Sequence, residues 1–241
     1  MQPDPGKLLE ISRIDLPLIG LYDAPSTGPF EPLVGPGAGK HVCIFAFFQS
    51  WLEGRTCLLT GEAFGCGGCG RQFFGARTRS REEFIDFLYR DEGLKATREL
   101  MEEWIDASGT YEPAHGHILM GPLNPEQYEH LLSVTFFVDP DQLSLMVYGA
   151  NYNAAPGDPD PVRAPFSSGC GQLINEFEDR DSARAVIGGT DVAMRKYLPR
   201  DILAFTVTRR MFEELCSLDE SSFLYKPFWS DLMKARGKGP A

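Results

Sequence analysis

Short apolar runs rich in β-branched and aromatic residues recur along the whole chain, and they constrain its fold more than any other feature. Seven of these runs have the length and composition of β-strands. They occupy residues 18–22, 57–60, 118–120, 133–138, 162–166, 185–187 and 202–207. The longest apolar run, 42–48, is far too short to cross a bilayer. We therefore expect a β-sheet and no association with a membrane.

Helix start signals separate these runs. Ser80 is followed three positions later by Glu83, which forms a capping box ahead of an apolar pattern at helical spacing. Asp139 is followed by Pro140, which predicts a helix with Asp139 as its N-cap and proline at its first position. Further helices are expected after Asn124 and over 227–233, and loops over 25–36 and 156–165. The sequence thus predicts an α+β fold, with a mixed β-sheet and flanking helices.

Length and composition fit a single globular domain over residues 1–241. Of the 241 residues 43% are hydrophobic, and 17 Phe and 3 Trp supply a core that needs no disulfide scaffold. The formal net charge is −11, and no basic patch with interleaved aromatic residues is present. Because an acidic chain repels phosphate, nucleic-acid binding is not expected. The composition leaves a homo-oligomer open.

The N-terminal residues also indicate where the protein is located. They lack the basic and apolar regions of a signal peptide. We therefore expect a cytoplasmic protein, whose thiols stay reduced. In that compartment, closely spaced cysteines indicate metal or redox chemistry more often than structural disulfides.

Three of the six cysteines are flanked by glycine on both sides. The tripeptides are Gly65-Cys66-Gly67, Gly68-Cys69-Gly70 and Gly169-Cys170-Gly171. Flanking glycines leave a thiol without steric cover and let the backbone adopt conformations that other residues resist. Apolar helical patterns follow these turns, and a cysteine at a helix start has a lowered pKa because of the helix dipole. These thiols are therefore expected to be accessible to a metal, a ligand or one another.

The cysteine spacing favours a metal or iron–sulfur site. Cys66 and Cys69 have the two-residue separation that lets both sulfurs bind one ion. Cys170, together with Cys43 or Cys57, could complete four ligands for zinc or an iron–sulfur cluster. Against this hypothesis, the chain has no second Cys-x-x-Cys, and the remaining spacings are irregular.

The same segments permit other interpretations. Cys66 and Cys69 could form a redox dithiol, although the Trp, Pro or His usual beside such a pair is missing. Residues 65–70 also match G-x-G-x-x-G, which could cradle a small anion or cofactor. The backbone that would bind it belongs to Gly65, Gly67, Gly68, Gly169 and Gly171.

Two further alternatives assign the thiols different roles. A thiolate-dependent enzyme would need a base within hydrogen-bond reach of a thiol, and none lies nearby in the chain. In the simplest alternative, the glycines allow close packing of helix on sheet and the cysteines fill the core. That interpretation applies most strongly to Cys216, which lies on an apolar helical stripe.

The glycine–cysteine turns also suggest an internal repeat. At an offset of 104 residues, the turn at Cys66 falls on the turn at Cys170. Across the windows 41–77 and 145–181, five of 37 aligned positions are identical, and the matches are clustered. A duplication would give two pseudo-symmetric halves.

Outside the cysteines, two pairs of polar residues are candidates for ligand contacts. His115 and His117 could bind a metal, but histidines two residues apart before a strand more often belong to a turn. Gln49 and Asn153 stand beside aromatic residues and could recognise a planar polar ligand, although amides in such places also cap helices.

Several short motifs together are similar to a known family. They are Cys43 with Ala46, Cys66-Gly67-Gly68 ahead of Phe73-Phe74-Gly75, Gly149-Ala150-Asn151-Tyr152, the turn at Cys170, and Gly188-Gly189-Thr190-Asp191 with Arg195 before a final strand. Over roughly residues 8–216 the chain resembles an uncharacterised prokaryotic family, catalogued as domain of unknown function 169. That family has no established activity, so the resemblance implies no mechanism.

The resemblance ranks the candidate ligands. It supports Cys66 and Cys170, and less firmly Cys43. Alanine is common in the family where this chain has Cys69, so a four-ligand scheme that requires Cys69 is weakened. We expect a soluble cytosolic protein whose glycine-flanked cysteines bind a metal or an iron–sulfur cluster. A small-anion or cofactor binding module and a thiolate-dependent enzyme remain the alternatives.

Overall fold

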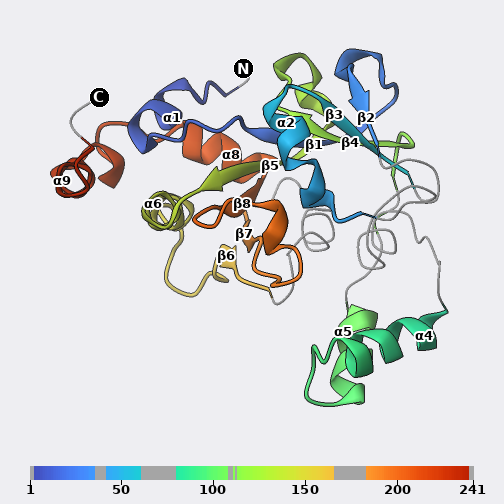
Figure 1. Cartoon of the computed structure of the whole chain (residues 1–241). Helices are drawn as coiled ribbons and strands as arrows, with labels where there is room; N and C mark the ends of the chain where they lie inside the picture. Colours follow the sequence, from blue (N-terminus) through green and yellow to red (C-terminus); the bar gives the residue numbers. More distant parts are fainter. Residues whose placement is uncertain are drawn as a thin grey trace.

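The computed structural model describes residues 3–35, 42–60, 80–107, 111, 113–165 and 183–238. Its centre is one mixed eight-stranded β-sheet with helices on its faces, so the predicted α+β fold is confirmed (Figure 1). The strands follow the spatial order β2-β3-β4-β1-β5-β8-β7-β6. Their bounds are β1 Ile19–Ala24, β2 Leu33–Val34, β3 Thr56–Leu59, β4 His117–Pro122, β5 Leu131–Val138, β6 Val162–Arg163, β7 Ala185–Gly188 and β8 Leu203–Thr208.

The two halves of the sheet have the same strand order. β2 pairs in parallel with β3, and β4 and β1 follow as antiparallel neighbours. In the other half β6 pairs in parallel with β7, and β8 and β5 follow in the same antiparallel way. The halves join through the antiparallel pairing of β1 with β5. An approximate twofold axis perpendicular to the sheet at this junction therefore relates β1–β4 to β5–β8.

This relation has a different offset from the repeat suggested by the sequence. β2 and β6, like β3 and β7, begin 129 residues apart, whereas the glycine–cysteine turns repeat at 104. Large parts of both repeat windows, 61–77 and 166–181, lie outside the described residues. The duplication of 41–77 in 145–181 thus stays a prediction, separate from the matching strand order.

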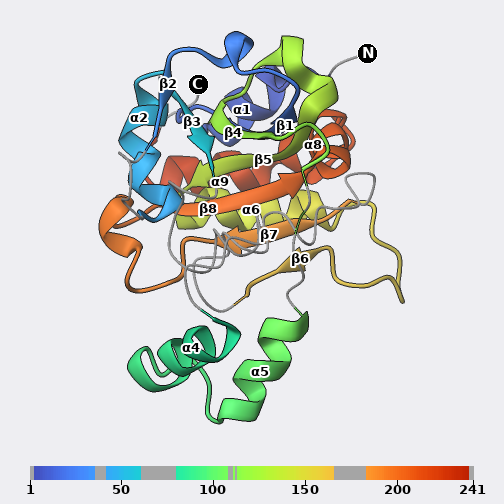
Figure 2. The same ribbon diagram turned by 90° about the vertical axis from the view of Figure 1, so that its right-hand side faces the viewer.

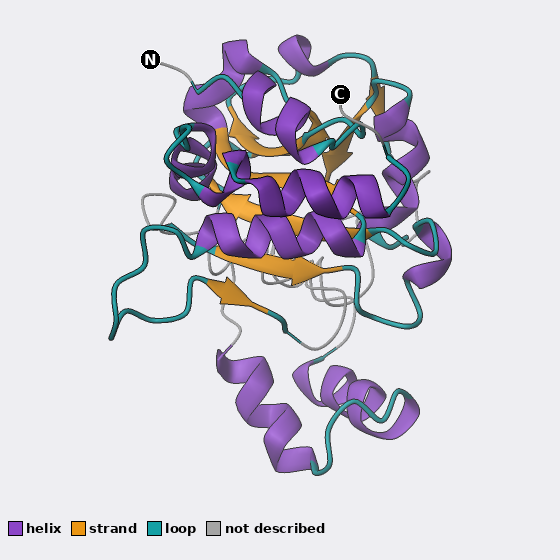
Figure 3. Cartoon of the chain, turned by 90° about the vertical axis from the view of Figure 1, so that its left-hand side faces the viewer, coloured by secondary structure: helices purple, strands orange, loops and turns teal. Residues whose placement is uncertain are grey.

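Four helices from both ends of the chain cover one face of the sheet, which we call the helical face (Figure 3). They are α1 Gly6–Ser12, α6 Pro140–Ala150, α8 Arg209–Cys216 and α9 Pro227–Ala235. Met146, Phe212 and Trp229 from three of these helices form one buried cluster with Tyr22 and Phe136 of the sheet. Burying each of these large side chains contributes roughly 1.5–3 kcal/mol relative to leaving it exposed.

The opposite face carries a second hydrophobic core, and we call it the α2 face. The 3₁₀-helix η2 Ile44–Phe47 runs directly into α2 Phe48–Leu52. Phe48 and Trp51 pack on Phe137 of β5, with ring centroids 4.7 and 6.0 Å apart. The Trp51 indole Nε1 donates a hydrogen bond of 3.0 Å to the Met120 carbonyl of β4. This buried bond fixes α2 against β4.

A helical hairpin between β3 and β4 projects away from the sheet (Figures 1 and 2). It comprises α4 Arg81–Asp86, the π-helical turn η3 Phe87–Asp91 and α5 Arg98–Ala107. Ile85 and Met101 are fully buried in a small cluster of the hairpin's own side chains. Arg98 of α5 forms ion pairs with Glu82 and Asp86 of α4. The hairpin thus has a core and a charge network separate from those of the sheet.

The helix start signals in the sequence are confirmed. Ser80 and Glu83 form the predicted capping box of α4. Asp139 caps α6 in the same reciprocal way, with Gln142 as its partner. α9 begins at Pro227 as expected, and the turn after Asn124 is the 3₁₀-helix η4 Pro125–His130. Three further short 3₁₀-helices are η1 Gly28–Phe30, η5 Arg195–Tyr197 and η6 Phe223–Tyr225.

Other elements differ from the sequence-based expectation. All seven predicted strands are present, but β6 is only two residues long and ends at Arg163. The stretch 25–36 is not simply a loop, since it contains η1 and β2. Neither side chain of β2 is fully buried, which explains why its two residues give no pattern in the sequence. Within the described part of the chain, no helix is long and apolar enough to span a bilayer.

The central strand provides a test of the packing. Gly20 of β1 lies under the ring of Tyr22, and a methyl group at position 20 would overlap that ring. Tyr22 is fully buried and its hydroxyl accepts a hydrogen bond from the Asn124 backbone, so the ring cannot move aside easily. We expect Gly20→Ala to lower the free energy of unfolding by about 1–3 kcal/mol in chemical denaturation.

Gly28→Ala is the matched control, because a methyl group there meets no atom within 4 Å. It should change stability by less than about 0.5 kcal/mol. Equal stability of the two variants would contradict the described packing of Tyr22 over Gly20.

Candidate functional site

The predicted site residues divide into two groups. Cys66, Cys69, Cys170 and the glycines beside them, Gly65, Gly67, Gly68, Gly169 and Gly171, lie outside the described residues. Cys43 and Cys57 lie inside them. The structure therefore describes two of the five candidate thiols.

Cys57 is a core residue of β3. Its side chain has no exposed surface and belongs to the core of the α2 face, where it pairs across strands with Met120. Burial raises the pKa of the Cys57 thiol well above its ordinary value, because the thiolate would lose its hydration. This environment suits a protonated thiol that fills space, and it makes Cys57 a less favourable ligand than the half-buried Cys43.

Cys43 has a different environment. It immediately precedes η2, and its carbonyl accepts a hydrogen bond of 2.9 Å from the Ala46 backbone. Its side chain is half-buried and packs at the margin of the α2-face core. Cys43 therefore lies in the connection between the parallel strands β2 and β3, at the surface of the core.

The central strands carry hydroxyl side chains on the α2 face. Thr135 of β5 and Thr206 of β8 are opposite each other in register, and their hydroxyl oxygens are 2.8 Å apart. Ser133 and Thr208 form the next pair on the same face. All four residues are buried. We call this set the hydroxyl patch; it is a polar area at the middle of a face that is otherwise hydrophobic.

A polar cavity of about 420 Å³ lies beside Asp23, near the end of β1. Asp23 is only 3% exposed, and its carboxylate accepts three hydrogen bonds. They come from the Tyr111 hydroxyl at 2.8 Å and from the backbone N–H groups of Ala114 and His115 at 2.6 and 3.0 Å. A buried carboxylate with three donors is satisfied, and it holds the chain before β4 against β1.

Two histidines also line this cavity. The rings of His115 and His130 are in edge-to-face contact, with centroids 5.3 Å apart. Glu129 places its Oε1 3.4 Å from His130 Nε2. Leu132, which also lines the cavity, has no partner on β1 because the register skips from Ser133 to Leu131. This β-bulge changes the direction of the chain at the start of β5, and His130, which comes just before β5, faces the cavity.

His115 and His117 do not converge. His115 lies in the bend before β4, as the sequence suggested, and its ring contacts His130 instead. His117 is the first residue of β4, and its Nδ1 is buried without a hydrogen-bond partner in the described part of the chain. The partner of His115 was missed because His130 precedes a different strand.

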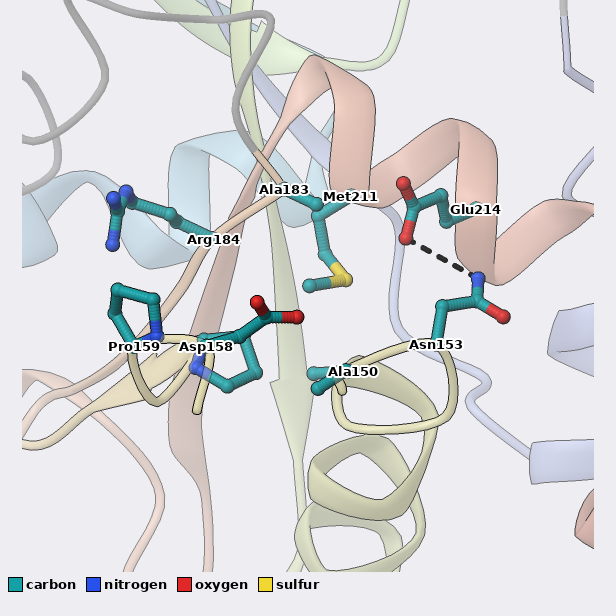
Figure 4. Close-up of a pocket in the computed structure, with 10 residues that line it drawn as sticks. Ala150, Asn153, Asp158, Pro159, Ala183, Arg184, Met211 and Glu214 are labelled. Carbon is teal, nitrogen blue, oxygen red and sulfur yellow. Dashed lines mark hydrogen bonds between the residues drawn. The ribbon is translucent and has the colours of Figure 1, made fainter. Parts of the chain in front are cut away.

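A second cavity of about 290 Å³ lies between the end of α6 and α8 (Figure 4). Asn153 donates a hydrogen bond of 3.4 Å to Glu214 on one side of it, and Arg184 lies on the opposite side. Arg210 also pairs with Glu214, at 3.0 Å. The Glu214 carboxylate of this cavity is thus already engaged by contacts within the protein.

Arg195 holds together the loop between β7 and β8. Its guanidinium donates hydrogen bonds to four backbone carbonyls, those of Gly189, Pro199, Arg200 and Ile202. The turn that follows Gly189 is capped by Asp191, whose carboxylate accepts a hydrogen bond of 2.8 Å from the Ala193 backbone. Because its donors are occupied by the loop, the guanidinium of Arg195 is a poor candidate for binding an anion.

Comparison with protein families identifies the chain. The model of domain of unknown function 169, described as an uncharacterised ArCR, matches residues 22–217. The chain belongs to this family. Comparisons with curated proteins and with solved structures gave no match. The matched region of this family member contains the whole sheet except the first three residues of β1, together with both cavities described above.

Among the described residues, no three His, Cys, Asp or Glu side chains are grouped so as to hold a metal ion. A site with a full set of protein ligands therefore needs ligands from the remaining segments of this family member. The described thiols can be sorted by environment: Cys57 is fully buried, whereas Cys43 and Cys216 are half-buried and pack at the margins of the two cores.

This sorting predicts thiol reactivity. Burial raises the pKa of Cys216 to about 12 and that of Cys57 further, and only the thiolate reacts with alkylating reagents. At pH 8 we expect iodoacetamide to modify both residues at least about a hundredfold more slowly in the native chain than in urea, as followed by peptide mass spectrometry. Equal rates in the two states would contradict the described burial.

Proposed function

We propose that this protein binds a metal ion or an iron–sulfur cluster through thiolates, with Cys66 and Cys170 as the main ligands. Cys43 and Cys69 would complete the set, and Cys57 would remain in the core. The observation that carries the proposal is the matching strand order of the two sheet halves, because it gives Cys43 and Cys170 equivalent places in the chain.

Both cysteines belong to connections between parallel neighbours. Cys43 lies between β2 and β3, 13 residues before Thr56, and Cys170 lies between β6 and β7, 15 residues before Ala185. Parallel neighbours need a crossover connection, and such crossovers are right-handed almost without exception. An axis perpendicular to the sheet keeps related crossovers on one face. We therefore expect the β6–β7 connection to cross the face that α2 covers.

The lengths of the connecting segments allow Cys66, as well as Cys170, to reach the hydroxyl patch. Cys66 lies seven residues beyond Leu59, the end of β3, and Cys170 lies seven residues beyond Arg163, the end of β6. Seven extended residues span at most about 25 Å. Each of the two strands is three neighbours away from β5, which is about 14 Å at ordinary strand spacing. By chain length, both thiols would be able to reach the hydroxyl patch from opposite halves of the sheet.

The chemistry of this area suits a thiolate centre. Thiolates are the protein ligands of zinc and of iron–sulfur clusters, and they are stabilised by nearby hydrogen-bond donors. Glycine flanks both Cys66 and Cys170 in the sequence, so backbone N–H groups would have steric access to the sulfurs, and the paired hydroxyls of Thr135 and Thr206 would leave one further donor. A cytosolic location would keep these thiols reduced.

Metal content tests the proposal. Full-length protein purified without oxygen should contain stoichiometric zinc or iron by elemental analysis, with a visible absorption spectrum if a cluster is present. We expect Cys66→Ser and Cys170→Ser each to lose most of the metal, because a serine hydroxyl is a poor ligand for these ions.

Cys216→Ser is the matched control. Cys216 packs in the core of the helical face, on the other side of the sheet, so this variant should keep its metal. Wild-type protein that is free of metal under these conditions would refute the thiolate centre. In that case the surviving hypothesis is a module that binds a small anion at the glycine-rich turns.

A further inference from the structure

We propose that His115 and His130 form a binding site for a divalent transition-metal ion of the zinc type, in the cavity beside Asp23. This site is independent of the cysteines. Its ligands are the two imidazole rings, and the remaining coordination positions are open to water or to a small ligand.

The ring geometry suits two imidazoles on one ion. The centroids of His115 and His130 are 5.3 Å apart and the ring planes are inclined by 81°. Zinc binds imidazole nitrogen at about 2.0–2.1 Å, so two imidazole ligands of one ion bring their rings to a similar separation. The rings come from segments on either side of β4, and they meet at the wall of a cavity of about 420 Å³ that has room for the ion and its waters.

The charges around the cavity favour a cation. Asp23 and Glu129 line it together with the two imidazoles, and no Lys or Arg is among the described residues of its wall. Two carboxylates would repel an anionic ligand at this position and attract a cation. Imidazole nitrogen selects zinc, nickel, copper or iron over calcium and magnesium, which prefer oxygen ligands.

Contacts with β1 hold the two segments that carry the rings. Asp23 fixes the backbone of His115 and Ala114, and the β-bulge at Leu132 sets the start of β5 directly after His130. Side chains held by such supports need little reorganisation when an ion binds. The Glu129 carboxylate beside His130 Nε2 is a further oxygen that could approach the ion by a change of rotamer.

With two protein ligands, the site keeps open positions. Structural zinc sites have four protein ligands, whereas sites that exchange water or bind a further ligand have fewer. The cavity therefore fits an ion that is accessible from solvent. This assignment also explains why a pair of histidines faces a cavity bordered by a buried carboxylate.

The test uses Zn²⁺ alone with the full chain. Histidine ring resonances should be followed by ¹H–¹⁵N correlation spectra during a Zn²⁺ titration, so that each imidazole reports separately. We expect His115 and His130 to shift together. His115→Ala and His130→Ala should each weaken Zn²⁺ binding at the remaining ring by about tenfold or more.

His117→Gln is the matched control, since His117 contributes nothing to the cavity wall. It should leave the Zn²⁺ affinity of the His115–His130 site unchanged, and so should Cys66→Ser, which separates this site from the thiolate centre. Rings that do not shift with Zn²⁺, or a His130→Ala variant in which His115 binds Zn²⁺ as tightly as before, would overturn the assignment.

Discussion

The antiparallel pairing of β1 with β5 holds the whole sheet together. On its other side β1 pairs with β4 and β5 pairs with β8, so the two four-stranded halves form one sheet only through this junction. All residues of both strands are buried, and Tyr22 packs so closely over Gly20 that a side chain has no room there. The β-bulge at Leu132 interrupts the same junction. The β1–β5 pairing therefore sets how the two halves of the sheet are related, and the bulge within it borders the cavity beside Asp23.

Much of this fold follows from local patterns in the sequence. The seven predicted strands and the starts of α4, α6 and α9 are encoded by neighbouring residues, through apolar runs, capping boxes and proline at the first helical position. Elements without such signals were missed. β2 has two half-buried residues, and α1 has no side-chain cap and ends instead at Arg13 in the left-handed conformation. Their stability comes from contacts made elsewhere in the chain.

The site was less predictable, because its contacts join distant segments. Asp23 is bound by Tyr111, which lies 88 positions later, and neither residue forms a motif with its neighbours. His115 was noticed beside His117, but its spatial partner His130 depends on the bulge in β5. For the cysteines, the structure narrowed a prediction made from the sequence. Their spacing predicted a shared site, whereas the environment of Cys57 distinguishes a buried packing thiol from the other candidates.

The thiolate centre that we propose would lie on the α2 face, with ligands from connections in opposite halves of the sheet. X-ray absorption at the edge of the bound metal tests it most directly, because the first shell reports the ligand atoms. The account predicts sulfur neighbours at about 2.3 Å in full-length protein purified without oxygen, and fewer of them in Cys170→Ser. A first shell of nitrogen and oxygen alone, unchanged in Cys170→Ser, would contradict it.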